Sequence, residues 1–146
     1  MKRPILLGPL LALAMLSGCV SYEPETWLNR GPITIDASRT GYCYTDANLI
    51  DGKRISGTLC ATPTSGFLMK GEPEIQFGPW GMKFMKELVS NTTQGVEYDY
   101  QDKRVRLQCS PVLDSASQET GRDCTVTMNA QHLVSATFLF VPQAAQ

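Results

Sequence analysis

The chain has 146 residues, which is enough for one ordinary domain and too few for two. Hydrophobic residues make up 42% and charged residues 18%, a balance typical of a globular protein and not of a disordered one. The formal net charge is -1, so the composition gives no reason to expect a nucleic-acid partner.

The first 18 residues have the features of a secretory signal peptide. Lys2 and Arg3 supply a positively charged start, and residues 5–16 form an apolar stretch behind them. A membrane-spanning helix needs about 20 apolar residues, so this stretch is too short to be one. A buried N-terminal helix is the alternative, and Pro4 and Pro9 disfavour it.

The junction after this leader, Leu16-Ser17-Gly18-Cys19, resembles the lipobox of bacterial lipoproteins. The resemblance implies cleavage before Cys19, a diacylglycerol thioether on its sulfur, and an acyl group such as palmitate on the new N-terminus. Each buried methylene adds about 0.8 kcal/mol, so two or three acyl chains make a durable membrane anchor. An aspartate after the cysteine retains many such lipoproteins in the inner membrane. Val20 stands there, so the resemblance implies the outer membrane, facing the periplasm.

These features divide the chain into four parts. Pro24, Gly31 and Pro32 make the segment before the domain a short tether. The predicted parts are a cleaved signal peptide (1–18), a lipidated N-terminus and tether (19–32), a single globular domain (33–142) and a tail (143–146).

Four cysteines follow Cys19, and in an exported chain an even number predicts disulfides. A zinc site is disfavoured because no two of them are as close as zinc-binding pairs require. Asp51-Gly52 is a strong signal for a two-residue hairpin turn, and that turn places Cys43 opposite Cys60. The two fall on a non-hydrogen-bonded pair with Cα atoms about 4.5 Å apart, which a disulfide can bridge.

The stretch VEYDYQDKRVRLQC alternates between apolar and polar residues and predicts a second hairpin. A four-residue turn over 101–104 would place Tyr100 opposite Val105 and Asp99 opposite Arg106. The charged pair is either an active-site pair or a surface contact of modest energy, and the surface contact is the simpler interpretation.

A second disulfide is predicted between Cys109 and Cys124, because this pairing also places Leu107 opposite Val126. The residues between the two cysteines form a polar loop closed at its base, and long loops often carry function. This loop is a candidate partner contact, with a tolerated surface insertion as the alternative. Its candidate contact residues are Asp114, Gln118, Glu119 and Arg122.

Residues 79–91 predict the main helix, with Gly78 as its cap and Pro79 in its first turn. At helical spacing its apolar side chains cover one broad face, which would pack on the sheet. Trp80 and Met82 on this face are the other candidate contacts for a partner, since methionine adapts to irregular surfaces.

The expected fold is therefore α+β. Strands near 33–37 and 74–77, the two disulfide hairpins and an apolar strand over 133–141 form a largely antiparallel sheet. The helix at about 79–91 lies on one face of it. The alternative is a β-sandwich with a helical insertion.

No catalytic arrangement is visible in the sequence. The single histidine, His132, lies in the expected turn between the last two strands, and no G-x-S-x-G elbow, phosphate loop or H-E-x-x-H motif is present. The chain is therefore predicted not to be an enzyme, with no catalytic or metal-binding residues. The acyl groups on Cys19 are the only attached groups expected.

Two functions from different classes remain. The first is a lipid-anchored, non-catalytic module that binds another envelope protein, as a subunit of an envelope machine, an inhibitor or an immunity factor. The second is a periplasmic carrier or sensor of a small apolar ligand, held between helix and sheet around Trp80 and Phe84, which requires an enclosed cavity of at least ~300 Å³.

Overall fold

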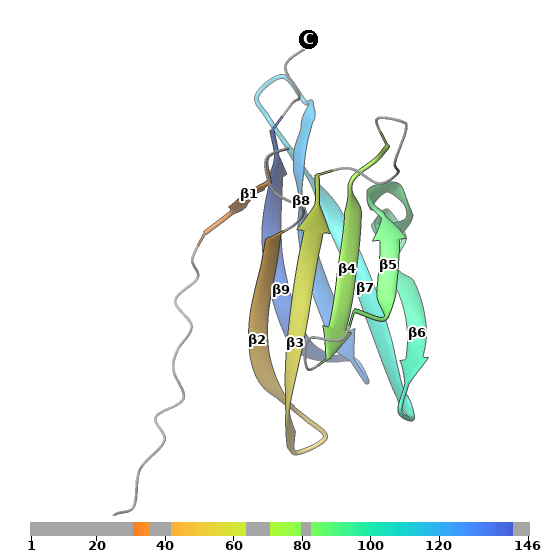
Figure 1. Ribbon diagram of the computed structural model, residues 1–146. Coiled ribbons are helices and arrows are strands. Elements are labelled where there is room, and N and C mark those ends of the chain that lie inside the picture. Colours follow the sequence, from red (N-terminus) through yellow and green to blue (C-terminus); the bar gives the residue numbers. More distant parts are fainter. Residues whose placement is uncertain (1–30, 36–41, 64–70, 80–82, 142–146) are drawn as a thin grey trace, which may run out of the picture.

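A computed structural model describes residues 31–35, 42–63, 71–79 and 83–141 as two β-sheets packed face to face (Figure 1). The strands are β1 (Ile33–Ile35), β2 (Tyr42–Ile50), β3 (Lys53–Thr62), β4 (Glu74–Pro79), β5 (Met85–Leu88), β6 (Val96–Tyr100), β7 (Lys103–Leu113), β8 (Glu119–Met128) and β9 (Gln131–Phe140). A short 3-10 helix, η1 (Val89–Thr93), connects β5 to β6.

Each sheet is built from strands that are consecutive in the chain. One sheet has the order β2-β3-β4-β5, and the other has the order β1-β9-β8-β7-β6. All pairs are antiparallel except β1, which runs parallel to β9 at the edge of the five-stranded sheet. The chain therefore completes one sheet before it begins the other, and only β1 departs from this order.

Three hairpins have two-residue turns whose central residues both have positive φ, as type I′ turns require. The turns are Asp51-Gly52 (φ 50° and 75°), Gln101-Asp102 (φ 46° and 63°) and Asn129-Ala130 (φ 49° and 61°). Their backbone twist matches that of the flanking strands, which favours this turn type even though five of the six positions carry a residue other than glycine.

The core lies between the two sheets. Leu59, Phe77 and Met85 stand in one row across β3, β4 and β5, and each is fully buried. They face the buried side chains of the other sheet, of which Phe138 is the largest. Gly57 lies in this interface because a Cβ there would stand 3.0 Å from Leu133 and Phe77.

Side-chain contacts join the two sheets near both long edges of the sandwich. At one edge the Asn48 amide of β2 donates a 2.9 Å hydrogen bond to the Leu133 carbonyl of β9. At the other edge Phe84 stacks on Tyr100 with ring centroids 5.0 Å apart, and meets Phe77 edge to face. Since these contacts join β2 to β9 and the segment before β5 to β6, both edges are tied across the sheets.

The predicted α+β class is wrong, because the region expected to form the main helix forms other structure. Pro79 ends β4, Met85–Leu88 form β5 against β4, and Val89–Thr93 form a single 3-10 turn. Of the expected alternative, the sandwich is present, and the described residues of the expected insertion form β5 and η1 and no α-helix. No helix in the described part of the chain is long and apolar enough to cross a membrane.

The reason lies in the pairing between β4 and β5. Phe77 pairs with Met85, so both bury their side chains in the core while Lys86 points outward. Sheet pairing and core burial therefore override the helical spacing of the apolar residues.

The two predicted disulfides are confirmed. Cys43 bonds to Cys60 and Cys109 bonds to Cys124, and in each pair the Cα atoms are 4.0 Å apart on directly opposed residues. The Asp51-Gly52 turn lies where the sequence places it, and Leu107 opposes Val126 as expected.

Two details of the second half differ from expectation. The β6–β7 turn contains two residues and not four, so Tyr100 pairs with Lys103 and Asp99 pairs with Arg104. Gln101 and Asp102 accept positive φ without glycine, which the sequence pattern gave no reason to expect. His132 lies within β9 and not in the turn before it.

The Asn129-Ala130 turn generates a test of backbone strain. Alanine is disfavoured at φ 61°, so Ala130→Gly should stabilise the protein by about 0.5–1 kcal/mol. Gly52→Ala is the matched control, because φ is 75° there and nothing lies within 4 Å of the added Cβ. It should destabilise by a similar amount. Urea unfolding measures both, and a destabilised Ala130→Gly protein would contradict the strain argument.

Candidate partner-binding surface

The segment expected to form a polar loop is mostly a continuation of β7 and β8. Strand pairing extends to Leu113 and resumes at Glu119, so only residues 114–118 form the turn. The hairpin extends past the end of β3 at one pole of the sandwich (Figure 1). Gly121 is required near its base, because a Cβ there would stand 2.2 Å from the Phe138 carbonyl oxygen.

The tip of this hairpin is held by Asp114. Its Oδ1 accepts hydrogen bonds from the backbone N–H groups of Ala116 (2.8 Å) and Gln118 (2.9 Å). Its own N–H donates to the Gln118 carbonyl at 2.9 Å, and Ser117 donates to the Asp114 carbonyl at 3.0 Å. Asp114 therefore shapes the turn, while the Gln118 side chain is exposed.

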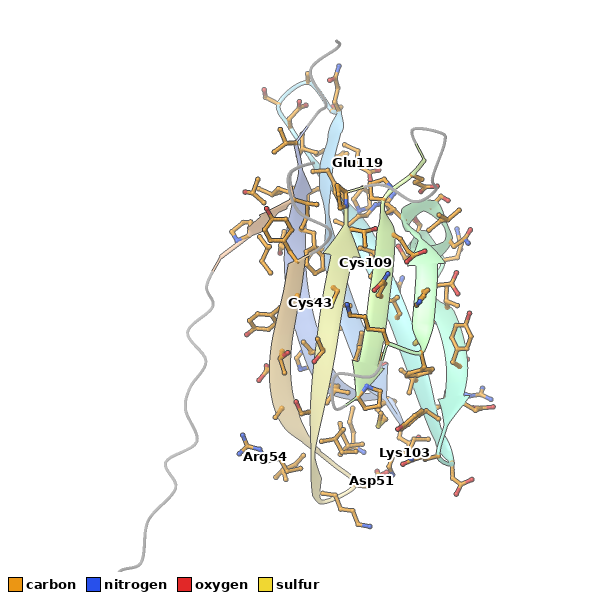
Figure 2. All side chains as sticks on the ribbon, viewed as in Figure 1. Cys43, Asp51, Arg54, Lys103, Cys109 and Glu119 are labelled. Carbon is orange, nitrogen blue, oxygen red and sulfur yellow. A yellow bond between two sulfur atoms is a disulfide. The ribbon has the colours of Figure 1, made fainter. Side chains whose placement is uncertain are left out.

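Arg122 and Glu119 lie on the β8 arm of the projecting hairpin. The Arg122 guanidinium donates to both carboxylate oxygens of Glu119, at 2.7 and 2.9 Å, and to the Thr93 hydroxyl of η1 at 2.6 Å. Arg122 is only 7% exposed, so these contacts fix it in place and tie β8 to η1. Figure 2 shows Glu119 at this pole, far from Asp51.

The predicted contact residues thus divide into groups. Asp114 and Gln118 lie in the turn, Glu119 follows it directly and pairs with Leu113, and Arg122 lies further along β8 opposite Pro111. Trp80 and Met82 lie outside the described residues.

Sequence reasoning missed an apolar surface on the same hairpin. Leu113 is 55% exposed, and Pro111 beside it is also exposed. By strand alternation Pro111 shares the face of the buried Cys109, and the register with β8 shifts between Val112 and Leu113. Both side chains are uncovered where the hairpin continues past the end of β3. Extending the apolar alternation past Cys109 would have revealed them.

A hollow of about 260 Å³ opens to solvent on the β6–β7 hairpin, lined by Glu97, Tyr98, Asp99 and Arg104. Arg104 lies 3.4 Å from Glu97 and 3.6 Å from Asp99, and Arg106 lies 3.0 Å from Glu97. These exposed charges alternate in sign and compensate one another, so they give the hollow little net field for a charged ligand.

This hollow is not the cavity expected for an apolar-ligand carrier. That site was placed between a helix and the sheet, and β5 and η1 replace the helix. The Phe84 ring is stacked on the Tyr100 ring, so this aromatic contact occupies the space beside Phe84 where the ligand was expected. Across the Glu97–Arg104 hollow and the rest of the described chain, no observation favours the carrier.

The opposite pole carries a polar cluster around Asp51. Its carboxylate accepts hydrogen bonds from the Lys103 ammonium (2.8 Å), the Asn129 amide (2.8 Å) and the Gln131 amide (2.7 Å). These donors, Lys103 foremost, lower the pKa of Asp51 from its ordinary 3.8 to about 2. The cluster joins the β2–β3 turn to the five-stranded sheet.

Near the β5–β6 edge, the Tyr98 hydroxyl donates a hydrogen bond to Glu87, which raises the pKa of Tyr98. Tyr98 is 39% exposed and also meets Phe84 edge to face. This contact adds to the aromatic closure of that edge.

His132 lies on the exposed face of the five-stranded sheet. Its Nε2 is 2.7 Å from the Ser135 hydroxyl, which is 3.0 Å from the Thr125 hydroxyl. Among the described residues, the hydrogen-bonded group formed by His132, Ser135 and Thr125 contains no carboxylate side chain. In residues 31–35, 42–63, 71–79 and 83–141, no group of three or more His, Cys, Asp or Glu side chains is placed to hold a metal.

Comparison with known proteins finds no relative of this chain: no family model matches it, and no curated protein or solved structure matches it significantly.

The Asp51 cluster predicts a specific acid sensitivity. Because the folded-state pKa of Asp51 is depressed, its contribution to stability is present above pH 3.8 and is lost as the pH falls through about 2. Asp51→Asn should remove this component, so thermal melts between pH 2 and pH 6 should show a weaker acid destabilisation than in the wild type. Asp102→Asn, in the neighbouring turn, should behave like the wild type. Identical pH profiles for wild type and Asp51→Asn would contradict the prediction.

The Arg122 contacts predict a large effect of truncation. Arg122→Ala leaves Glu119 and Thr93 without their partner, and should destabilise the protein by about 2–3 kcal/mol. Arg104→Ala is the matched control, because its side chain is 66% exposed and its ion pairs should contribute less than about 0.5 kcal/mol. Chemical denaturation measures both, and equal losses would show that Arg122 has no special structural role.

Proposed function

We propose that this chain is a lipid-anchored lipoprotein of the bacterial outer membrane that faces the periplasm and binds another envelope protein without catalysing a reaction. The lipobox-like Leu16-Ser17-Gly18-Cys19 supports the anchor. Two disulfides support an oxidising compartment, since such bonds persist outside the cytosol.

The observation that carries the binding role is the projecting β7–β8 hairpin. It presents Leu113, 55% exposed, on a support fixed by the core disulfide and by the Arg122–Glu119–Thr93 contacts. A rigid apolar side chain binds with a smaller entropic cost than a mobile one. Interfaces gain most of their affinity from a few such anchors surrounded by polar residues, and Gln118 supplies polar surface nearby.

The anchor is tested by a substitution at the junction. Cys19→Ala should release the protein from the membrane fraction, because the acyl chains have no sulfur to which they can attach. Ser21→Ala, two residues away, should remain membrane-bound. Intact-mass measurement of the wild-type protein should find a chain that begins at Cys19 and carries acyl groups. A wild-type protein without acyl groups, or a Cys19→Ala protein that stays membrane-bound after its leader has been removed, would contradict the anchor.

The binding surface is tested by photo-cross-linking in living cells. A photoreactive amino acid in place of Leu113 should capture one dominant envelope protein. The same amino acid in place of Gln101, in the turn at the opposite pole, is the matched control and should capture none.

Leu113→Asp should in addition reduce recovery of that protein by roughly tenfold or more, as expected for an interface anchor. No capture at Leu113, or the same proteins captured at both positions, would contradict the hairpin as the binding surface.

A further inference from the structure

The two disulfides have the same local geometry and different surroundings. Both join directly opposed residues of an antiparallel hairpin, with Cα atoms 4.0 Å apart. Cys109 and Cys124 are 1% and 0% exposed and belong to the core between the sheets. Cys43 is exposed, and Cys60, although buried, is not part of that core.

Strand alternation explains the difference. Tyr42 and Tyr44 pack against the core, so Cys43 between them points to the outer face of the four-stranded sheet. Leu107 and Val126 are fully buried, so Cys109 and Cys124, two residues away on each strand, point inward. One bond therefore has its Cys43 end at the surface, whereas both cysteines of the other are buried in the core.

Position in the sheet adds a second difference. A thiolate attacks a disulfide in line with the S–S bond, from the side opposite the leaving sulfur, so access to that side controls the rate. Cys43 lies on β2, an edge strand, and no strand of its sheet lies beyond it in the described chain. An attack on Cys43 therefore approaches from the open edge. β8 lies between β7 and β9, and β7 has β6 and η1 on its other side, and both cysteines of their disulfide lie in the core.

We propose that Cys43–Cys60 is a thiol-exchange site for a protein dithiol of the envelope, and that Cys109–Cys124 is a structural bond. The attacking thiolate forms a mixed disulfide with Cys43 Sγ and releases Cys60 as a thiolate, which takes up a proton. The second thiol of the dithiol then attacks the mixed disulfide and releases Cys43 as a thiol. The dithiol is oxidised to a disulfide, and the protein disulfide is reduced to two thiols.

The hairpin has other interactions that keep it folded after this exchange. The β2–β3 ladder extends over nine residue pairs, from Tyr42↔Ala61 to Ile50↔Lys53. The Thr45 and Thr58 hydroxyls lie 2.9 Å apart on the same face as the disulfide, and Asn48 still binds the Leu133 carbonyl. The reduced protein should therefore keep its sandwich and expose a thiol at Cys43.

The first experiment compares the reactivity of the two bonds in the folded full-length protein. The protein is treated with dithiothreitol, alkylated with N-ethylmaleimide and mapped by peptide mass spectrometry, which reads the Cys19 peptide separately. Cys43, whose side chain is exposed, should be labelled at least about tenfold faster than Cys109 and Cys124, with an unchanged circular dichroism spectrum. Equal rates, faster labelling of the core pair, or labelling only after the spectrum is lost would each overturn the proposal.

The second experiment asks which sulfur is attacked. Reduced glutathione should form a mixed disulfide on Cys43, and a mixed disulfide found chiefly on Cys60 would overturn the attack from the open edge. In the paired variant Cys43→Ser/Cys60→Ser the fast labelling should disappear while the slow labelling of Cys109 and Cys124 remains. If fast labelling persists in that variant, it belongs to the core bond and the assignment is wrong.

Discussion

Each sheet contains one pair of strands whose register is fixed by a covalent bond between directly opposed residues. In a sheet with one buried face, a slip of one residue would move every side chain of a strand to the other face. The Cys109–Cys124 bond holds Leu107 and Val126 in the core, and the Cys43–Cys60 bond holds Leu59 there. In the chain-entropy model, closing loops of 17 and 15 residues contributes on the order of 3 kcal/mol each. The rest of the sandwich is assembled on these two hairpins.

The two poles of the sandwich are held by different means. At one pole a single carboxylate, Asp51, accepts hydrogen bonds from three side chains of the opposing sheet and keeps the hairpin turns together. At the other pole a buried guanidinium, Arg122, ties the projecting hairpin to η1. The first pole holds this polar cluster and also Leu49, which is 67% exposed, and the second carries Leu113, which is 55% exposed. What distinguishes the second pole is the projecting hairpin, and this projection favours it for contact with a partner.

The sequence was most informative where a local rule determines the structure. Asp51-Gly52 defines a turn, the turn defines the register, and the register brings Cys43 to Cys60. The secondary structure between Pro79 and Val89 could not be predicted in this way, because the spacing of its apolar residues fits a helix. Met85–Leu88 form a strand because they pair with β4, and no local pattern in the sequence indicates that pairing. The predicted length of the β6–β7 turn was wrong for a related reason, since Gln101 and Asp102 adopt positive φ without the glycine that usually marks a two-residue turn.

The candidate surface was also only partly visible in the sequence. The polar residues at the hairpin tip stood out, but the exposure of Leu113 depends on how far the opposing sheet extends, which no local pattern records. Arg122 looked like a surface charge, yet it is buried because η1 places Thr93 beside it. Such features depend on contacts between segments that are distant in the chain.

The short strand β1 has a mechanical consequence. It pairs with β9 over only three residues, and it is the first strand of the sandwich after the N-terminal segment. Any tension applied to that segment reaches β1 before it reaches the consecutive strands β2–β5 or β6–β9. Ile33–Ile35 would then separate from β9 first. The tether would become longer, while the eight other described strands keep their arrangement.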